Sequence, residues 1–150
     1  MKLDPNFAYA FHNLALALFR LGEHKHVVKG VKQAKLDVAL ASLNAAEHKF
    51  TEHDLKYFEL DVKKAENDIS TIFELALDAI DRATSIRYEF PQAHNTKAMI
   101  LAKWARLDEA IEATEVALSQ KPDYKNASKN REIMKEYRET ISGYKHVGVY

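Results

Sequence analysis

Histidine side chains are the residues in this chain whose chemistry could serve a metal ion. The seven histidines include His24-x-His26 and the pair His48 and His53. A protein zinc site needs three or four ligands around one ion. If His24 and His48 lie at opposite ends of one helix, a rise of 1.5 Å per residue separates them by ~36 Å. We therefore expect no metal site.

Carboxylates are the second group that could do chemistry, as general acids or bases. Glu109, Glu112 and Glu115 are predicted to lie on exposed helix faces beside lysine and arginine, which is typical of a solvated surface. The sequence has no glycine-rich phosphate loop, nucleophile elbow or metalloprotease helix motif. We expect no catalytic residue and no cofactor, and therefore a protein that is not an enzyme.

Composition excludes further classes of function. The 22 basic and 22 acidic side chains cancel, so the basic surface that nucleic-acid binding needs is missing. There is no cysteine, which suits a reducing compartment, and we expect a cytoplasmic protein. The first residues lack the apolar stretch of a signal peptide. No apolar run reaches the ~18–20 residues of a spanning helix, so we expect no membrane insertion.

The elements that would position these side chains are all predicted to be helices, because helix formers dominate and there are only four glycines and three prolines. The first helix is expected over 7–21, with Gly22 as its stop, and a second over 23–49. The second helix carries two apolar stripes, which predicts that it is covered on two sides. One stripe is Val27, Val31, Ala34, Val38, Ala41 and Ala45, and the other is Val28, Leu36, Ala39, Leu43, Ala46 and Phe50.

A third helical stretch is expected over 52–87, beginning at Thr51-x-x-Asp54, which resembles a capping box. One helix or two could carry its heptad stripe, and we favour two helices that meet at a turn within 67–71. The residues of this segment are poor helix formers, and Thr71-x-x-Glu74 is a second capping box. The stripe is Leu55, Phe58, Val62, Ala65, Ile69, Ile72, Ala76, Ala79, Ala83 and Ile86.

Proline and glycine also divide the last third of the chain. Helices are expected over 91–105 and 107–120, and Lys121-Pro122-Asp123 breaks the chain before a last helix that reaches about Ser142. We expect one domain over 1–143 and a loosely ordered tail over 144–150.

The chain contains an internal repeat. Leu3-Asp4-Pro5-Asn6-Phe7 and Gln120-Lys121-Pro122-Asp123-Tyr124 are the same type of turn, and the apolar and small residues after the first turn match in spacing those that follow Pro91. The first set is Phe11, Leu14, Ala15, Leu18, Val27, Val31 and Ala34, and the second is His94, Lys97, Ala98, Leu101, Ala110, Thr114 and Ala117. This pattern resembles the tetratricopeptide repeat, whose unit has 34 residues.

The resemblance implies an all-α solenoid of about three helix pairs and a C-terminal capping helix, with an elongated second helix. It also implies a concave surface, formed by the first helices of the pairs, that receives a segment of a partner protein. The residues expected to bind the partner are Tyr9, His12, Asn13, Leu16, Asn95, Met99, Lys103 and Lys129. The alternative for this surface is that Leu16 and Phe19 are core residues and that the polar residues are merely solvated.

The sequence therefore predicts a non-catalytic protein-interaction module or scaffold that binds a partner protein or peptide. The alternative is self-association into a homodimer, either through the helical seam over 55–86 or through the first helix pair, which carries Phe7 and Phe11.

Overall fold

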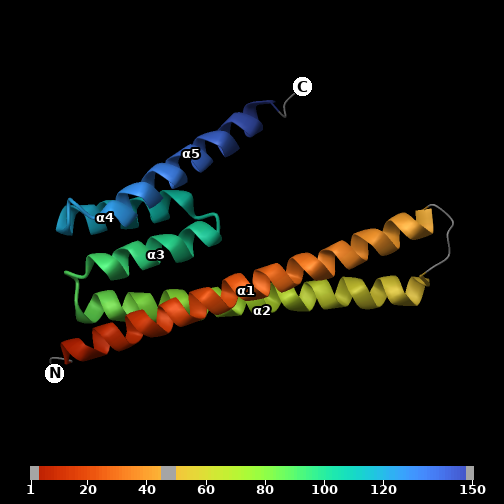
Figure 1. The fold of residues 1–150 in the computed structure, drawn as a ribbon, viewed down its shortest axis with the longest axis horizontal. Helices are drawn as coiled ribbons and strands as arrows, with labels where there is room; N and C mark the ends of the chain where they lie inside the picture. The colour runs from red at the N-terminus through yellow and green to blue at the C-terminus, as the bar shows by residue number, and fades with distance from the viewer. Residues whose placement is uncertain (1–3, 45–49, 148–150) are drawn as a thin grey trace. The chain divides into compact units, whose positions relative to one another are not determined.

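The computed structural model describes residues 4–44 and 50–147, and this part of the chain contains five α-helices and no strand (Figure 1). The helices are α1 (Pro5–Asn44), α2 (Glu52–Ile86), α3 (Pro91–Lys103), α4 (Leu107–Gln120) and α5 (Lys125–Val147). The predicted all-α class is confirmed. None of these helices combines the length and the apolar character that a membrane crossing needs. His48 and the predicted end of the second helix at Lys49 lie outside the described residues.

Side chains at the first turns explain where the two long helices begin. The backbone N–H of Asn6 donates to Asp4 Oδ1 at 2.9 Å, and Pro5 occupies the first helical position, where no N–H is needed. At α2, the Thr51 N–H donates to Asp54 Oδ2 at 2.8 Å, and the Asp54 N–H donates to Thr51 Oγ1 at 3.2 Å. The predicted capping box is therefore confirmed.

Two of the predicted breaks in the first half of the chain, at Gly22 and within 67–71, are wrong. Helix α1 continues through Gly22, because a glycine weakens a helix by ~1 kcal/mol but does not end it where packing supports both flanks. Helix α2 continues through the segment 67–71, where Ile69 is buried and Thr71 Oγ1 donates to the Asn67 carbonyl at 3.0 Å. The described residues accordingly form five helices in place of three pairs and a cap.

The chain divides into two compact units, which we call the hairpin unit (18–74) and the terminal unit (1–17 with 75–150). In the hairpin unit, α1 and α2 pack through the rings of Phe19 and Phe73, whose centroids are 6.2 Å apart. Ion pairs flank this contact, since Lys29 Nζ lies 2.9 Å from Glu66 and Lys32 Nζ lies 2.7 Å from Asp61.

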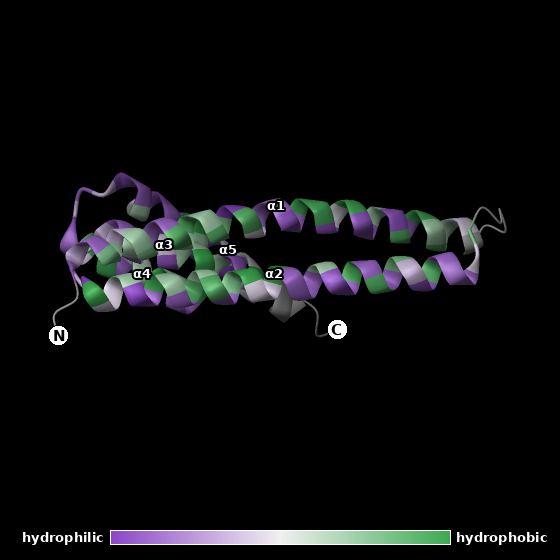
Figure 2. Cartoon of the chain, turned by 90° about the horizontal axis from the view of Figure 1, so that it is seen from below, coloured by the Kyte–Doolittle hydropathy of each residue, from purple (hydrophilic) through white to green (hydrophobic). Residues whose placement is uncertain are grey.

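Helix α1 is covered on one side only within the hairpin unit, so the predicted two-sided coverage is wrong. Leu36 and Ala39 are buried, whereas Val27, Val31 and Val38 are 68%, 57% and 60% exposed. Hydrophobic residues recur along this part of α1 (Figure 2), and these valines lie on its surface. The packing of two helices hides only one stripe of each, and no further helix of the hairpin unit covers the second.

The heptad stripe of α2 is largely buried by the chain itself. Three of its buried members lie in the hairpin unit and three in the terminal unit. The stripe over 55–86 is therefore not a free surface for a second copy of the chain. The buried members are Val62, Ala65, Ile69, Ala76, Ala79 and Ala83.

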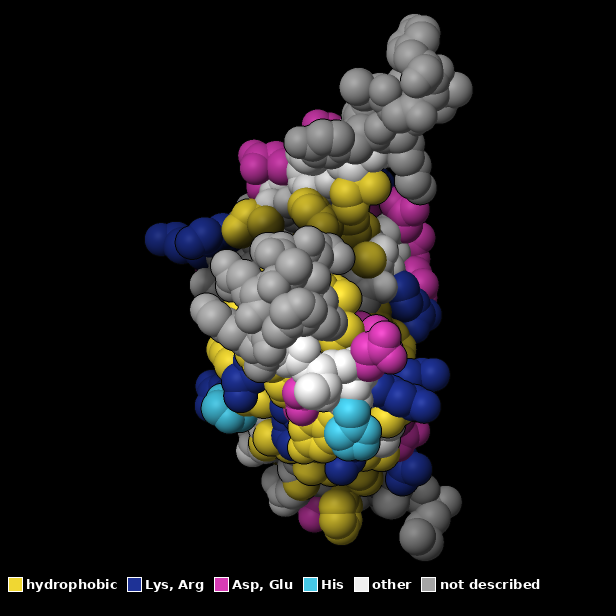
Figure 3. Space-filling model, turned by 90° about the vertical axis from the view of Figure 1, so that its right-hand side faces the viewer, with side chains coloured by type: hydrophobic (Ala, Val, Ile, Leu, Met, Phe, Trp, Pro, Cys, Tyr) yellow, Lys and Arg dark blue, Asp and Glu magenta, His cyan; other side chains and the backbone are white. Residues whose placement is uncertain are grey.

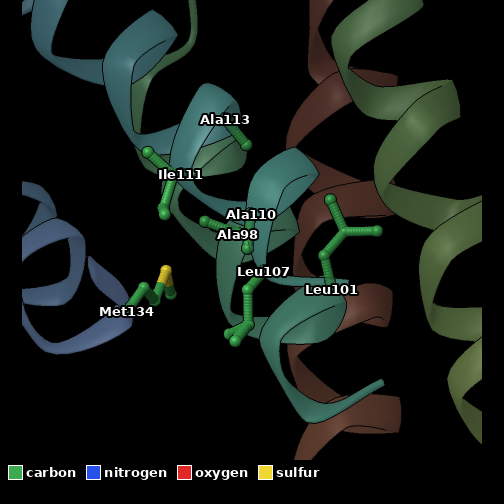
Figure 4. Close-up of a cluster of buried hydrophobic side chains, with 7 residues drawn as sticks. All are labelled: Ala98, Leu101, Leu107, Ala110, Ile111, Ala113 and Met134. Atoms are coloured by element: carbon green, nitrogen blue, oxygen red, sulfur yellow. The ribbon is translucent and has the colours of Figure 1, made fainter. Parts of the chain in front are cut away.

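The terminal unit has a core in which small residues of α3 and α4 meet larger residues from α3, α4 and α5 (Figure 4). Ala98 and Ala110 are fully buried between α3 and α4, which lets the two helices approach closely. The cluster is Ala98, Leu101, Leu107, Ala110, Ile111, Ala113 and Met134. Large and small side chains thus fill the space between three helices.

A left-handed residue ends α3 two residues before its predicted end. Ala105 has φ 57°, the Arg106 N–H donates to the Leu101 carbonyl at 3.0 Å, and the Ala105 N–H donates to the Ala102 carbonyl at 3.0 Å. This is a Schellman motif with alanine where glycine is usual. Helix α4 has the predicted bounds. Helix α5 runs past Gly143 to Val147, so the predicted helix end near Ser142 is wrong. The last residues of the predicted tail, 148–150, lie outside the described residues.

Two glycines of α1 should respond in opposite directions to replacement by alanine. A Cβ at Gly22 would lie 2.7 Å from Phe73 Cε1, a buried ring that has little room to move, whereas a Cβ at Gly30 meets nothing within 4 Å. We expect Gly30→Ala to stabilise the protein by ~0.5–1 kcal/mol and Gly22→Ala to destabilise it by ~1–3 kcal/mol. Urea unfolding followed by circular dichroism measures both, and equal effects would contradict the close packing of α1 on Phe73.

The contact between α3 and α4 should not tolerate a larger residue at Ala110. We expect Ala110→Leu to cost ~1–3 kcal/mol of unfolding free energy, because the added methyl groups must displace neighbouring core side chains. The matched control is Ala10→Leu at an exposed position of α1, which should be nearly neutral. If both substitutions have the same effect in thermal and urea unfolding, the α3–α4 packing described above is incorrect.

Candidate functional site

A groove between α3 and α5 in the terminal unit brings together three of the residues expected to bind a partner. Asn95 and Met99 of α3 lie along one wall, and Lys129 of α5 lies along the other. The groove encloses about 400 Å³, and its remaining lining residues are Asn126, Asn130 and Ile133. Amide groups therefore dominate its polar surface, beside a thioether and a branched aliphatic side chain.

Hydrogen bonds fix the inner wall of the α3–α5 groove. Asn130 Nδ2 donates to Asn95 Oδ1 at 3.0 Å, which links the two helices. Asn95 Nδ2 in turn lies 3.9 Å from Met99 Sδ, at the long distance usual for sulfur. Asn95 is only 6% exposed, so its orientation is set by the fold before any ligand arrives.

In the outer part of the groove, two polar side chains have no hydrogen-bond or ion-pair partner among the described residues. Asn126 and Lys129 are exposed and have no hydrogen-bond or ion-pair partner within the described part of the chain. Ile133 is exposed by half, which leaves an apolar contact surface beside them. An amide provides two donors and one acceptor group, and the ammonium of Lys129 adds a single positive charge.

Tyr9 and His12 lie at a different place in the terminal unit, around the buried ring of Phe90. Both rings meet Phe90 edge to face, with centroid distances of 5.0 Å for Tyr9 and 4.9 Å for His12. The Arg87 guanidinium donates to the Tyr9 hydroxyl and also lies over the Tyr9 ring, 5.2 Å from its centroid. His12 Nε2 lies 3.0 Å from Thr96 Oγ1. These contacts hold the first part of α1 against the start of α3, so Tyr9 and His12 stabilise the fold of the terminal unit.

The other residues expected at the partner-binding surface do not line the α3–α5 groove. Asn13 is exposed and Leu16 is half-buried on α1, while Lys103 is exposed in the last turn of α3. Phe19 is buried against Phe73, so for this residue the alternative of a core position is correct.

A second hollow of the terminal unit, of about 240 Å³, contains titratable side chains from α3 and α4 that would suit acid–base chemistry. Most of these groups already have partners. His94 Nε2 lies 2.8 Å from the Tyr88 carbonyl, and Lys97 Nζ lies 2.6 Å from Asp81. Hydrogen bonds from Arg106 lower the pKa of Glu109. These interactions tie loops and helices together.

Within the part of the chain that the structure describes, no three histidine, aspartate or glutamate residues lie close enough together to bind a metal ion.

Sequence reasoning missed the α5 side of the groove except for Lys129. Asn126, Asn130 and Ile133 follow one another at steps of four and three, so they share a helix face with Lys129. Their shared spacing with Lys129 was the signal in the sequence, but polar residues beside a single isoleucine are also ordinary on a helix face that meets solvent.

Comparison with protein-family models gives no match for this chain, and comparisons with curated proteins and with solved structures give no significant match.

Stability should fall in mild acid because of His12. Burial lowers the pKa of His12 below its ordinary value of 6.5, so the folded protein binds this proton less readily than the unfolded chain does. The contribution of neutral His12 is therefore complete above pH 6.5 and is lost as the pH falls below that value. Urea unfolding between about pH 7.5 and 5.5 should show a larger loss for the wild type than for His12→Gln.

The control for this measurement is His24→Gln at an exposed position, which should lose stability on acidification as the wild type does. A His12→Gln variant with the full acid sensitivity of the wild type would mean that another group causes it.

Proposed function

We propose that this chain is a protein-interaction module, whose α3–α5 groove binds an extended segment of a partner protein. The observation that carries the proposal is the set of amide groups in the groove, of which Asn126 lacks a partner within the described residues. An extended peptide presents one N–H and one C=O per residue, and side-chain amides pair with both.

We also propose that α3, α4 and the start of α5 form a tetratricopeptide-like unit. Three observations support this arrangement. The helices α3 and α4 have 13 and 14 residues, the small residues Ala98 and Ala110 are buried in one cluster with Leu101, and Pro122 lies in the turn before α5. In such a unit the first helix lines the concave side, and the α3–α5 groove lies along α3.

The side chains of the groove indicate which peptide it would prefer. Met99 and Ile133 offer an adaptable apolar contact. The ammonium of Lys129, which has no ion-pair partner among the described residues, favours an acidic residue beside it. Because Asn95 is held in place by Asn130, little side-chain entropy is lost on this wall when a peptide binds. A groove of this size with one charge suggests binding near micromolar Kd, about −8 kcal/mol.

Selection of peptides from a displayed random library against the folded chain tests this proposal. We expect the enriched peptides to be extended, to combine an acidic with an apolar residue, and to bind with roughly micromolar Kd. Removing the ordered amide and reversing the charge should each weaken binding by about ten-fold, so we expect this loss for Asn95→Ala and for Lys129→Glu. Isothermal titration calorimetry measures the change.

The matched control is Lys64→Glu, which reverses an exposed charge on α2 outside the groove and should leave the peptide Kd unchanged. If the enriched peptides bind Asn95→Ala and Lys129→Glu as tightly as they bind the wild type, while both variants keep their helix content, the groove is not the binding site.

A further inference from the structure

The hairpin unit exposes an apolar helix face that its own packing leaves uncovered. This face, which we call the α1 outer face, consists of Val27, Val31, Ala34, Val38 and Ala41, all exposed. Exposed hydrophobic side chains among lysine and arginine are visible in the space-filling view (Figure 3). Single exposed apolar residues are ordinary on protein surfaces, but a continuous row of them marks an interaction site.

A hollow of about 510 Å³ adjoins the α1 outer face. Val31, Ala34 and Val38 form one wall, and Phe50 and Phe58 form the other. The two phenylalanine rings meet edge to face, with centroids 6.0 Å apart. This hollow can receive a large apolar side chain, which is how an anchor residue of a partner docks.

The spacing of the α1 outer face indicates the shape of its partner. Its members follow at steps of four, three, four and three, the heptad spacing with which one helix packs along another. The β-branched Val31 and Val38 alternate with the small Ala34 and Ala41, so the face has the knobs and holes of a helix–helix contact. An extended strand or a flat sheet would not follow this seam.

Charge decides between a second copy of the chain and a different partner. Lys35 is the one charged residue that lines the hollow, and it has no ion-pair partner within the described residues. The neighbouring Lys29 and Lys32 are already paired with Glu66 and Asp61. In an antiparallel two-fold dimer centred on this face, residues near Ala34 meet their own copies, so Lys35 would face another Lys35. An acidic group at that position removes the repulsion.

We propose that the α1 outer face binds an amphipathic helix of another protein, which inserts apolar residues at heptad spacing and places a glutamate or aspartate beside Lys35. This surface belongs to the hairpin unit. It shares no residue with the α3–α5 groove, so a substitution in one site leaves the residues of the other unchanged. The pattern corresponds to helix-in-groove recognition, with a buried anchor in the hollow and a charge pair at its rim.

Two synthetic helical peptides of about three heptads test the proposal against the full chain. Both carry leucine at heptad spacing, and they differ only in having glutamate or lysine beside the leucine seam. We expect fluorescence anisotropy to show that the glutamate peptide binds the wild type about ten-fold more tightly than the lysine peptide. Lys35→Glu should reverse this preference, and Val31→Asp should abolish binding of both peptides.

Val31 and Lys35 are exposed, so both variants should keep their circular dichroism spectra, and Lys64→Glu on α2 provides the charge control. Equal affinity for the two peptides, or glutamate-peptide binding that survives Val31→Asp, would overturn the proposal. So would a wild-type dimer in sedimentation equilibrium that Val31→Asp converts to monomer, because a second copy would then occupy the face. None of these variants alters the α3–α5 groove, so the outcome is separate from that of the peptide selection.

Discussion

Close approach between helices through alanine is the constraint on which the rest of this structure depends. Every helix contributes at least one buried alanine, and α1, α2 and α4 contribute three or more each. A side chain with one methyl group lets two helix axes come near the lower end of the usual 8–10 Å range. The buried alanines are Ala8, Ala15, Ala39, Ala65, Ala76, Ala79, Ala83, Ala93, Ala98, Ala110, Ala113, Ala117 and Ala127. Larger apolar residues such as Phe73, Ile80 and Leu101 fill the space beside these alanines, and other large apolar residues remain on the surface.

The composition and the capping signals predicted the helices well where they agreed with the packing. Helix α4 has the expected bounds, and the capping box at Thr51 opens α2 as expected, because its hydrogen bonds are local in sequence. The interior breaks could not be predicted in the same way. Gly22 and the segment 67–71 have low helix propensity, but the packing of Gly22 against the distant Phe73 and the burial of Ile69 outweigh it.

The candidate groove was predicted in part, for a similar reason. The resemblance predicted one concave surface that included Asn95, Met99 and Lys129 among eight residues, and these three line one groove in the structure. The same resemblance suggested Tyr9 and His12, yet their rings pack on Phe90, an aromatic residue in the turn before α3. The tertiary contact with Phe90 decides whether such a residue faces solvent or packs on a buried ring. The repeat spacing alone does not distinguish the two cases.

The turn after α3 contains a residue whose fluorescence can report on local unfolding. The chain has a single tryptophan, Trp104, which caps α3 next to Ala105, and the guanidinium of Arg106 lies over its ring at 5.9 Å. Its fluorescence therefore follows the surroundings of the α3–α4 turn, whereas far-ultraviolet circular dichroism follows the helices of both compact units. Coincident transitions by the two signals would mean that the chain unfolds as one cooperative body, and separated transitions would mean that the hairpin unit opens on its own.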